Sequence, residues 1–155
     1  MLLLRDEQVP LLLKRKHVVS GYRPLNQPTL FYVKSAFSPH NEVFNFWTHL
    51  LPAIILFFAY FVPELMSPLP RVPVLILQVG ILLLLIASSS AHLMHSRSEL
   101  DHVFWFLIDF SGIALFGITI GLQRYSSSDH MSLAMKIVSF VVGHASYNEI
   151  FLLKL

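Results

Sequence analysis

The fold is decided by residues 74–95, which read VLILQVGILLLLIASSSAHLMH. As a helix, this run is long enough to cross the roughly 30 Å hydrocarbon core of a bilayer. It ends in polar residues that include Ser88, His92 and His95, and the next apolar run, at about 102–122, contains Asp109. Ionisable side chains are costly in hydrocarbon, so those found in spanning segments are candidates for a functional site.

The composition of the whole chain indicates an integral membrane protein. Its 155 residues are 55% hydrophobic and 13% charged, with a mean hydropathy of +0.64. A soluble domain carries about a quarter charged residues and lacks apolar runs of membrane length. The net charge of +2 is too small to suggest nucleic acid as a partner, and the absence of cysteine excludes thiolate metal ligands. The predicted fold class is all-α, a multi-pass transmembrane helical bundle.

The basic residues are unevenly distributed, and this predicts a cytoplasmic N-terminus. Six of the eleven Lys and Arg precede the first long apolar run, and such residues are retained on the cytoplasmic side. They are Arg5, Lys14, Arg15, Lys16, Arg23 and Lys34. The initial Met1–Leu4 run is too short for a signal peptide, and basic residues follow it instead of preceding it. We expect an integral protein of the plasma membrane, in contact with its lipids.

Apolar runs and turn-forming residues predict five segments. The arm before the first span combines a short apolar patch with a basic cluster, which favours contact with anionic headgroups. Because 96–101 is short, the second and third spans should form a helical hairpin. Polar residues interrupt the last segment, which we interpret as a divergent tail or a weak fourth helix. The segments are a cytoplasmic arm at 1–44, transmembrane helices at 45–66, 74–95 and 102–122, and the tail at 131–155.

Two sets of polar residues are expected at the cytoplasmic end of the helices. Ser88 and His92 lie four residues apart and share a helix face, while His92 and Asp109 lie at similar depth on either side of the hairpin turn. A histidine and a carboxylate at one depth fit metal chemistry, and they equally fit a buried polar pair that stabilises the hairpin. Spacing alone leaves both interpretations open.

The second set is Glu42, Asn45 and His49, whose spacings of three and four place them on one face of the first helix. Polar residues are ordinary at a helix start, and Ser38 or Asn41 is a candidate N-cap. Because His92 and Asp109 are expected at the same level, we favour a shared polar cluster. The remaining histidines near polar sequence are expected to be exposed. They are His17, His40, His102 and His130.

Three motifs resemble the progestin and adiponectin receptor family, which is related to hemolysin III. They are Glu42-x-x-Asn45-x-x-x-His49, Ser88-x-x-x-His92, and Asp109 followed by Ser111-Gly112. The segments Gly21–Pro24 and Asn41–Leu50 look like the membrane progestin receptor branch in particular. The resemblance covers about residues 20 to 125.

This resemblance implies a seven-helix membrane protein with a zinc ion held by three histidines near the cytoplasmic side. His92 would be a zinc ligand, Asp109 would have the catalytic role of orienting the zinc-bound water, and Ser88 would lie beside them. The other two ligands belong to a His-x-x-x-His in the seventh helix of the family, a pattern that does not occur after His102 here. We therefore expect an incomplete zinc site in a chain truncated after its third transmembrane helix.

The resemblance implies a membrane receptor that binds a steroid, such as a progestin, or another lipid and signals through a G protein or the full-length receptor. The first alternative is a zinc-dependent lipid amide hydrolase of the ceramidase type, which needs three protein ligands for its zinc. With only His92 expected, we predict no hydrolysis by this chain alone. The second alternative is a non-catalytic, truncated membrane adaptor, suggested by the small residues Gly112, Gly117 and Gly121.

Overall fold

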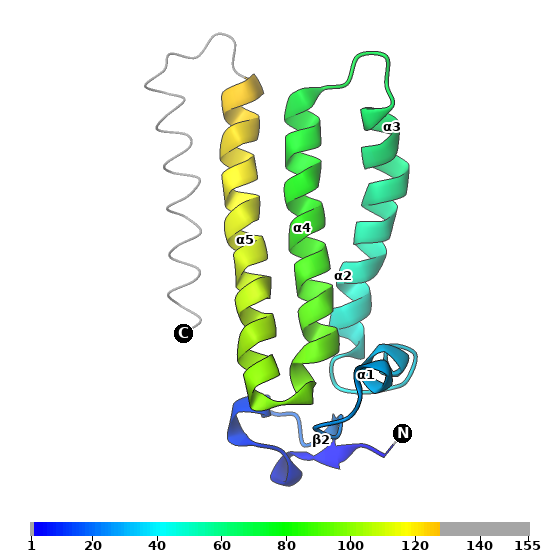
Figure 1. Cartoon of the computed structure of the whole chain (residues 1–155), viewed down its shortest axis with the longest axis vertical. Coiled ribbons are helices and arrows are strands. Elements are labelled where there is room, and N and C mark those ends of the chain that lie inside the picture. The colour runs from blue at the N-terminus through cyan, green and yellow to red at the C-terminus, as the bar shows by residue number, and fades with distance from the viewer. Residues whose placement is uncertain (1, 128–155) are drawn as a thin grey trace. The chain divides into compact units, whose positions relative to one another are not determined.

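The computed structural model describes residues 2–127 as a helical protein (Figure 1). Within these residues, three helical stretches are long and apolar enough to cross a membrane, namely Val43–Leu65, Val72–Arg97 and Glu99–Ser127. The predicted all-α, multi-pass class is therefore confirmed. The third stretch continues through the polar residues after Leu122, five residues beyond the end predicted for the helix at 102–122. The tail predicted at 131–155 lies outside the described residues.

The chain folds as two compact units. Among the described residues, the first contains 2–51 together with Ile86–Asp109, and the second contains Pro52–Leu85 together with 110–127. The helical elements in chain order are α1 (Thr29–Ser35), α2 (Val43–Ile55), a π-helical stretch (Leu56–Phe61), α3 (Val62–Leu65), α4 (Val72–Met94), a 3-10 turn (His95–Arg97) and α5 (Glu99–Ser127).

In the first unit, the N-terminal arm is folded, and its residues Val9, Leu13 and Tyr22 are buried. Strand β1 (Leu4–Arg5) pairs antiparallel with β2 (Ser20–Tyr22), and two 3-10 turns, Asp6–Gln8 and Leu11–Leu13, lie between them. The Tyr22 hydroxyl donates to the Val18 carbonyl at 2.9 Å and accepts from the Arg15 backbone N–H at 2.9 Å. These bonds hold the basic segment in a defined loop.

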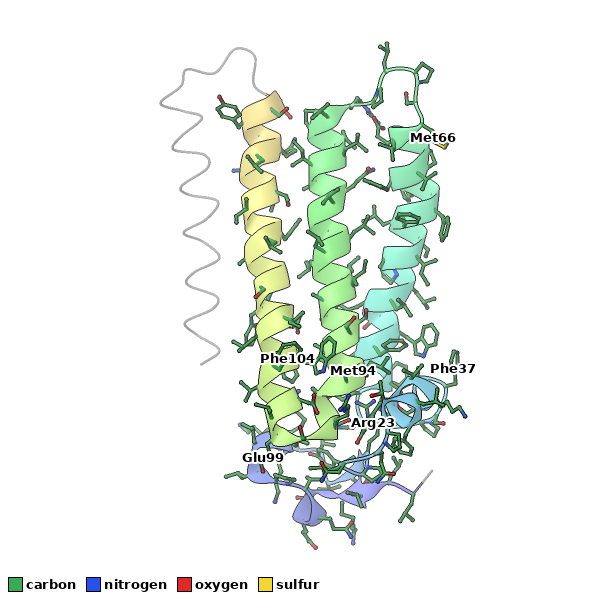
Figure 2. The ribbon with its side chains drawn as sticks, viewed as in Figure 1. Arg23, Phe37, Met66, Met94, Glu99 and Phe104 are labelled. Atoms are coloured by element: carbon green, nitrogen blue, oxygen red, sulfur yellow. The ribbon has the colours of Figure 1, made fainter. Side chains whose placement is uncertain are left out.

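Arg23 fastens this arm to the end of α4, and Figure 2 shows it beside that helix end. It is 1% exposed, and its Nη1 and Nη2 donate to the carbonyls of Leu93 at 2.7 Å and His92 at 2.9 Å. The last carbonyls of a helix lack partners within the helix, so the guanidinium satisfies acceptors that would otherwise be buried unpaired. The Ser35 hydroxyl accepts a further bond at 3.0 Å. Burial lowers the pKa of Arg23 to about 10, which leaves the side chain charged at neutral pH.

The hairpin turn between α4 and α5 is set by a local capping arrangement. Ser98 Oγ accepts from the Asp101 backbone N–H at 3.0 Å and donates to Asp101 Oδ2 at 2.8 Å. A serine before a helix, with an acid three residues later, is a common way to satisfy the first free N–H groups. The cap starts α5 immediately after the 3-10 turn, and this places His102 near His95.

In the second unit, α2 continues past Pro52 and is followed by the π-helical stretch. There the Val62 N–H donates to the Phe57 carbonyl, five residues earlier. Proline lacks the N–H that a regular helix needs, and local irregularity beside it is expected. Helices α4 and α5 approach closely at Gly80. A Cβ at this position would overlap Thr119 Oγ1, so only glycine fits the observed spacing.

The hydrogen bonds from Arg23 to the end of α4 lead to a stability prediction. Arg23→Ala should lower the free energy of unfolding by about 3 kcal/mol, because it leaves the carbonyls of His92 and Leu93 buried without donors. Denaturation of the purified chain in detergent, followed by circular dichroism, measures this change. Lys34→Ala is the matched control, since Lys34 is an exposed cation on α1. Equal losses of unfolding free energy in the two variants would contradict this role of Arg23.

Candidate functional site

A buried carboxylate, Glu42, is the centre of the polar cluster in the first unit. Glu42 is 2% exposed, and its backbone carbonyl accepts a hydrogen bond from the N–H of Phe46 in the first turn of α2. The carboxylate accepts from Arg15 Nε at 3.2 Å on one oxygen, and from Asn45 Nδ2 at 2.7 Å and His92 Nδ1 at 2.8 Å on the other. An ionised carboxylate can only accept, so the proton in the last bond is on His92 Nδ1.

The environment of Glu42 favours its ionised form. Burial alone would raise the pKa of Glu42, but hydrogen bonds from His92 and Asn45 and the nearby His95 lower it well below the usual range of a carboxylic acid. The position before the first turn of α2 adds the positive end of the helix dipole. The centre is therefore a fixed negative charge with nitrogen donors around it.

His95 contributes a second imidazole from the 3-10 turn after α4. The residue is 2% exposed, and its Nε2 lies 3.6 Å from Glu42 Oε1. This Nε2 makes no hydrogen bond to any residue in the described part of the chain. Its Nδ1 lies 3.2 Å from His102 Nδ1, so one of these nitrogens donates and the other accepts. His95 thus presents a buried nitrogen toward the carboxylate.

Phe106 of α5 forms an apolar wall beside the cluster. Its ring centroid lies 5.8 Å from that of His92, 5.1 Å from that of His95 and 4.8 Å from that of His102. The Arg15 guanidinium carbon lies 4.9 Å from the same centroid. An apolar ring therefore borders the three imidazoles on this side of the site.

The structure brings Glu42, Asn45 and His49 together at His92. The carboxylate bonded to His92 belongs to Glu42 and not to Asp109. Glu42 and Asn45 are bonded to each other, and His49 stacks on His92 with centroids 5.9 Å apart. His92 bonds to Glu42, and among the described residues no hydrogen bond or ion pair joins it to the half-buried Asp109. Counting along the helices gives depth but not direction around the axis, which explains the difference. Ser88 is buried, one turn before His92.

The exposure predicted for two histidines is wrong. His40 is 7% exposed and His102 is 8% exposed. His40 Nδ1 accepts the Glu42 backbone N–H at 3.1 Å, so it performs the capping expected of Ser38 or Asn41. Burial lowers the pKa of His40 to about 4, which keeps the ring neutral and able to accept. His17 is exposed, and His130 lies outside the described residues.

Sequence reasoning missed three participants in the site, namely Arg15, His95 as a partner of Glu42, and His102. One signal was available for the histidines: they lie seven residues apart across a short turn, at the level of His92. Arg15 carried no such signal, because it stands within a basic cluster that equally suits lipid headgroups.

The cluster contains donor atoms suited to a metal ion. Glu42, His92 and His95 each offer one ligand atom, and these three atoms lie within 4.8 Å of one another. Imidazole nitrogen and carboxylate oxygen are both common ligands of zinc. The unbonded His95 Nε2 is an independent sign of fit, since buried polar nitrogens are nearly always paired.

Comparison with known proteins places these features in a family. The model of the haemolysin-III-related family matches residues 37–151. The chain is 35% identical to human membrane progestin receptor alpha over 76% of this chain and 35% of that protein. It is 32% identical to human membrane progestin receptor beta over 92% of this chain and 42% of that protein. Zebrafish membrane progestin receptor alpha-B is 33% identical over 76% of this chain and 34% of its own length.

The chain thus spans less than half the length of these relatives. The family match covers the end of the arm, the spanning helices, and the residues Glu42, His92 and His95, called here the Glu42 cluster. With three membrane-length helices in its described part, the chain is an integral membrane protein that belongs to the haemolysin-III-related family and is of the progestin and adiponectin receptor type.

Proposed function

We propose that this protein acts as a membrane receptor of the progestin type, binding a steroid or a related lipid. The observation that carries the proposal is the 35% identity to human membrane progestin receptor alpha across 76% of this chain. The N-terminal arm faces the cytoplasm of a plasma-membrane protein, as the basic residues predict. Signalling then passes through a G protein or through association with a full-length receptor.

An apolar groove in the second unit supports lipid binding. Its volume is about 380 Å³, within the range of roughly 300–1,000 Å³ that small-molecule sites occupy. Side chains from α3, α4 and α5 line it, among them Leu65, Val79, Thr119 and Leu122. The fused rings of a steroid are apolar, so they can pack against the apolar side chains of such a groove.

The groove leads to a binding prediction. Membranes containing the 155-residue chain should bind tritiated progesterone saturably, and Val79→Trp should weaken binding at least about tenfold by filling the groove. Val103→Trp is the matched control, because Val103 is exposed on α5 in the first unit. Absence of saturable binding would contradict the proposed receptor function. An unchanged affinity of Val79→Trp for progesterone would mean that the steroid binds outside this groove.

We propose zinc as the metal cofactor, with His92 among its ligands, as the family resemblance implies. The nitrogen and oxygen donors around His92 fit this metal. As the resemblance implies, Asp109 would orient a zinc-bound water and Ser88 would lie beside His92 on the same helix face. When bound in such sites, zinc supplies Lewis-acid polarisation of a carbonyl and activation of water.

The second candidate function is a zinc-dependent hydrolase acting on a lipid amide such as ceramide. The donor set of two imidazoles and one carboxylate favours it, because catalytic zinc commonly uses three such ligands. Against it, a hydrolase needs a proton acceptor near the reacting carbonyl, and Asp109 is not bonded to the cluster in the described part of the chain. The receptor proposal therefore stands first.

Ceramide turnover separates the two candidates. The purified 155-residue chain, loaded with zinc in detergent, should not release fatty acid from ceramide above the rate without protein. Quantification of released fatty acid by mass spectrometry measures this, with His92→Ala as the control for a contaminating activity. Turnover that disappears in both His92→Ala and Asp109→Asn would favour the hydrolase over the receptor.

A further inference from the structure

We propose that α1 lies in the membrane interface, with its outer face buried among the lipids of the leaflet beside the arm and Lys34 at anionic headgroups. In the proposed orientation this is the cytoplasmic leaflet, which carries anionic lipids. The contact surface is then α1 and not the basic cluster Lys14–Lys16, in which Arg15 bonds to the buried Glu42. The inference goes beyond the receptor proposal and does not depend on steroid or zinc binding.

The outer face of α1 is apolar and exposed. Leu30 is 60% exposed, Val33 is 45% exposed and Phe37 is 80% exposed. Their spacings of three and four place them on one side of the helix. Phe37 follows the end of α1, and its N–H donates to the Lys34 carbonyl at 3.3 Å, so the helical turn extends to it. Figure 2 shows Phe37 on the outer side of the molecule. Three large apolar side chains therefore face outward together.

The opposite face of α1 is fixed, so the helix cannot turn its apolar side inward. Tyr32 is fully buried, and Ser35 is 2% exposed. The Tyr32 hydroxyl donates to the Pro24 carbonyl at 2.7 Å, and the Ser35 hydroxyl accepts from Arg23, which also binds the end of α4. Rotation of α1 would break these hydrogen bonds and leave buried polar groups unpaired.

The apolar face of α1 continues the lipid-facing surface of the first spanning helix. Trp47 Nε1 donates to the Ala36 carbonyl at 2.7 Å, and the Trp47 and Phe37 ring centroids lie 5.5 Å apart. Trp47 lies near the start of the membrane-length stretch Val43–Leu65, where Phe44 is 81% exposed. Tryptophan is typical of the boundary between membrane and water. Figure 1 shows α1 beside the start of α2, so its apolar face lies at this boundary.

The charge of α1 favours anionic phospholipids as its partner. Lys34 is exposed in the last turn, and α1, with the sequence TLFYVKS, contains no acidic residue. A lysine beside an apolar face lays its methylene groups along the apolar surface while its ammonium reaches the lipid phosphates. This arrangement is typical of helices that lie in the plane of a membrane interface.

Site-specific spin labelling tests the position of α1 directly, because the chain contains no cysteine and a single introduced one can be labelled. The Val33→Cys variant of the 155-residue chain is labelled with a nitroxide in vesicles of phosphatidylcholine and phosphatidylserine. Its relaxation by oxygen should exceed that by a water-soluble nickel chelate, at a depth of about 5–10 Å into the interface. Phe44→Cys is the reference for lipid, and Val19→Cys, at an exposed position of the arm, is the reference for water.

Lys34→Glu tests the role of charge in the labelled Val33→Cys background. It should raise accessibility to the nickel chelate at least about twofold in vesicles with phosphatidylserine, because it replaces attraction to anionic lipid with repulsion. The increase should disappear in vesicles of phosphatidylcholine alone. Lys14→Glu is the matched control, since Lys14 is an exposed cation of the basic cluster, and it should leave the label unchanged. Lys34 lies outside the buried face of α1, so circular dichroism should show the same helix content in both variants.

Three results would overturn the inference. A label at Val33 that resembles Val19→Cys, while Phe44→Cys reports lipid, would show that α1 lies in water. A label that neither oxygen nor nickel reaches would show that protein covers the face, and dipolar broadening that disappears on dilution with unlabelled chain would identify a second copy. A larger effect of Lys14→Glu than of Lys34→Glu would assign the headgroup contact to the basic cluster instead.

Discussion

The structure of the first unit depends above all on the buried carboxylate of Glu42. A carboxylate removed from water is tolerated only when its oxygens receive several donors. Here the donors come from three parts of the chain: Arg15 from the arm, Asn45 from α2 and His92 from α4. Segments far apart in sequence must therefore meet at one point, and they position His95 in the following turn beside the same carboxylate.

Arg23 serves a related purpose at the same helix end. It binds the final carbonyls of α4, and those carbonyls belong to His92 and its neighbour Leu93. The side chain of His92 is thus held by Glu42 while its backbone is held by Arg23. Because both its side chain and its backbone are bonded, His92 keeps its orientation without a bound ligand. A binding or metal site requires such preorganisation.

The helices and part of the site could be predicted because each depends on local pattern. Apolar runs of membrane length predicted the three spanning helices, and the spacing of Glu42, Asn45 and His49 predicted a shared polar face. The partner of His92 could not be predicted in this way. Helical rise gives the depth of Asp109, but the direction of its side chain depends on helix rotation, which packing determines. Arg15 and Arg23 were unpredictable for a similar reason, since a basic segment has the same composition whether it contacts lipid or a buried carboxylate.

X-ray absorption at the zinc edge of the zinc-loaded 155-residue chain shows whether zinc binds at His92 beside Glu42. We expect nitrogen and oxygen neighbours at about 2.0 Å from the zinc, with more distant scattering from imidazole rings. In Glu42→Gln the affinity should fall, and any zinc that remains should lose the carboxylate contribution. A spectrum with no imidazole scattering, or one with three imidazoles that is unchanged in Glu42→Gln, would contradict the account.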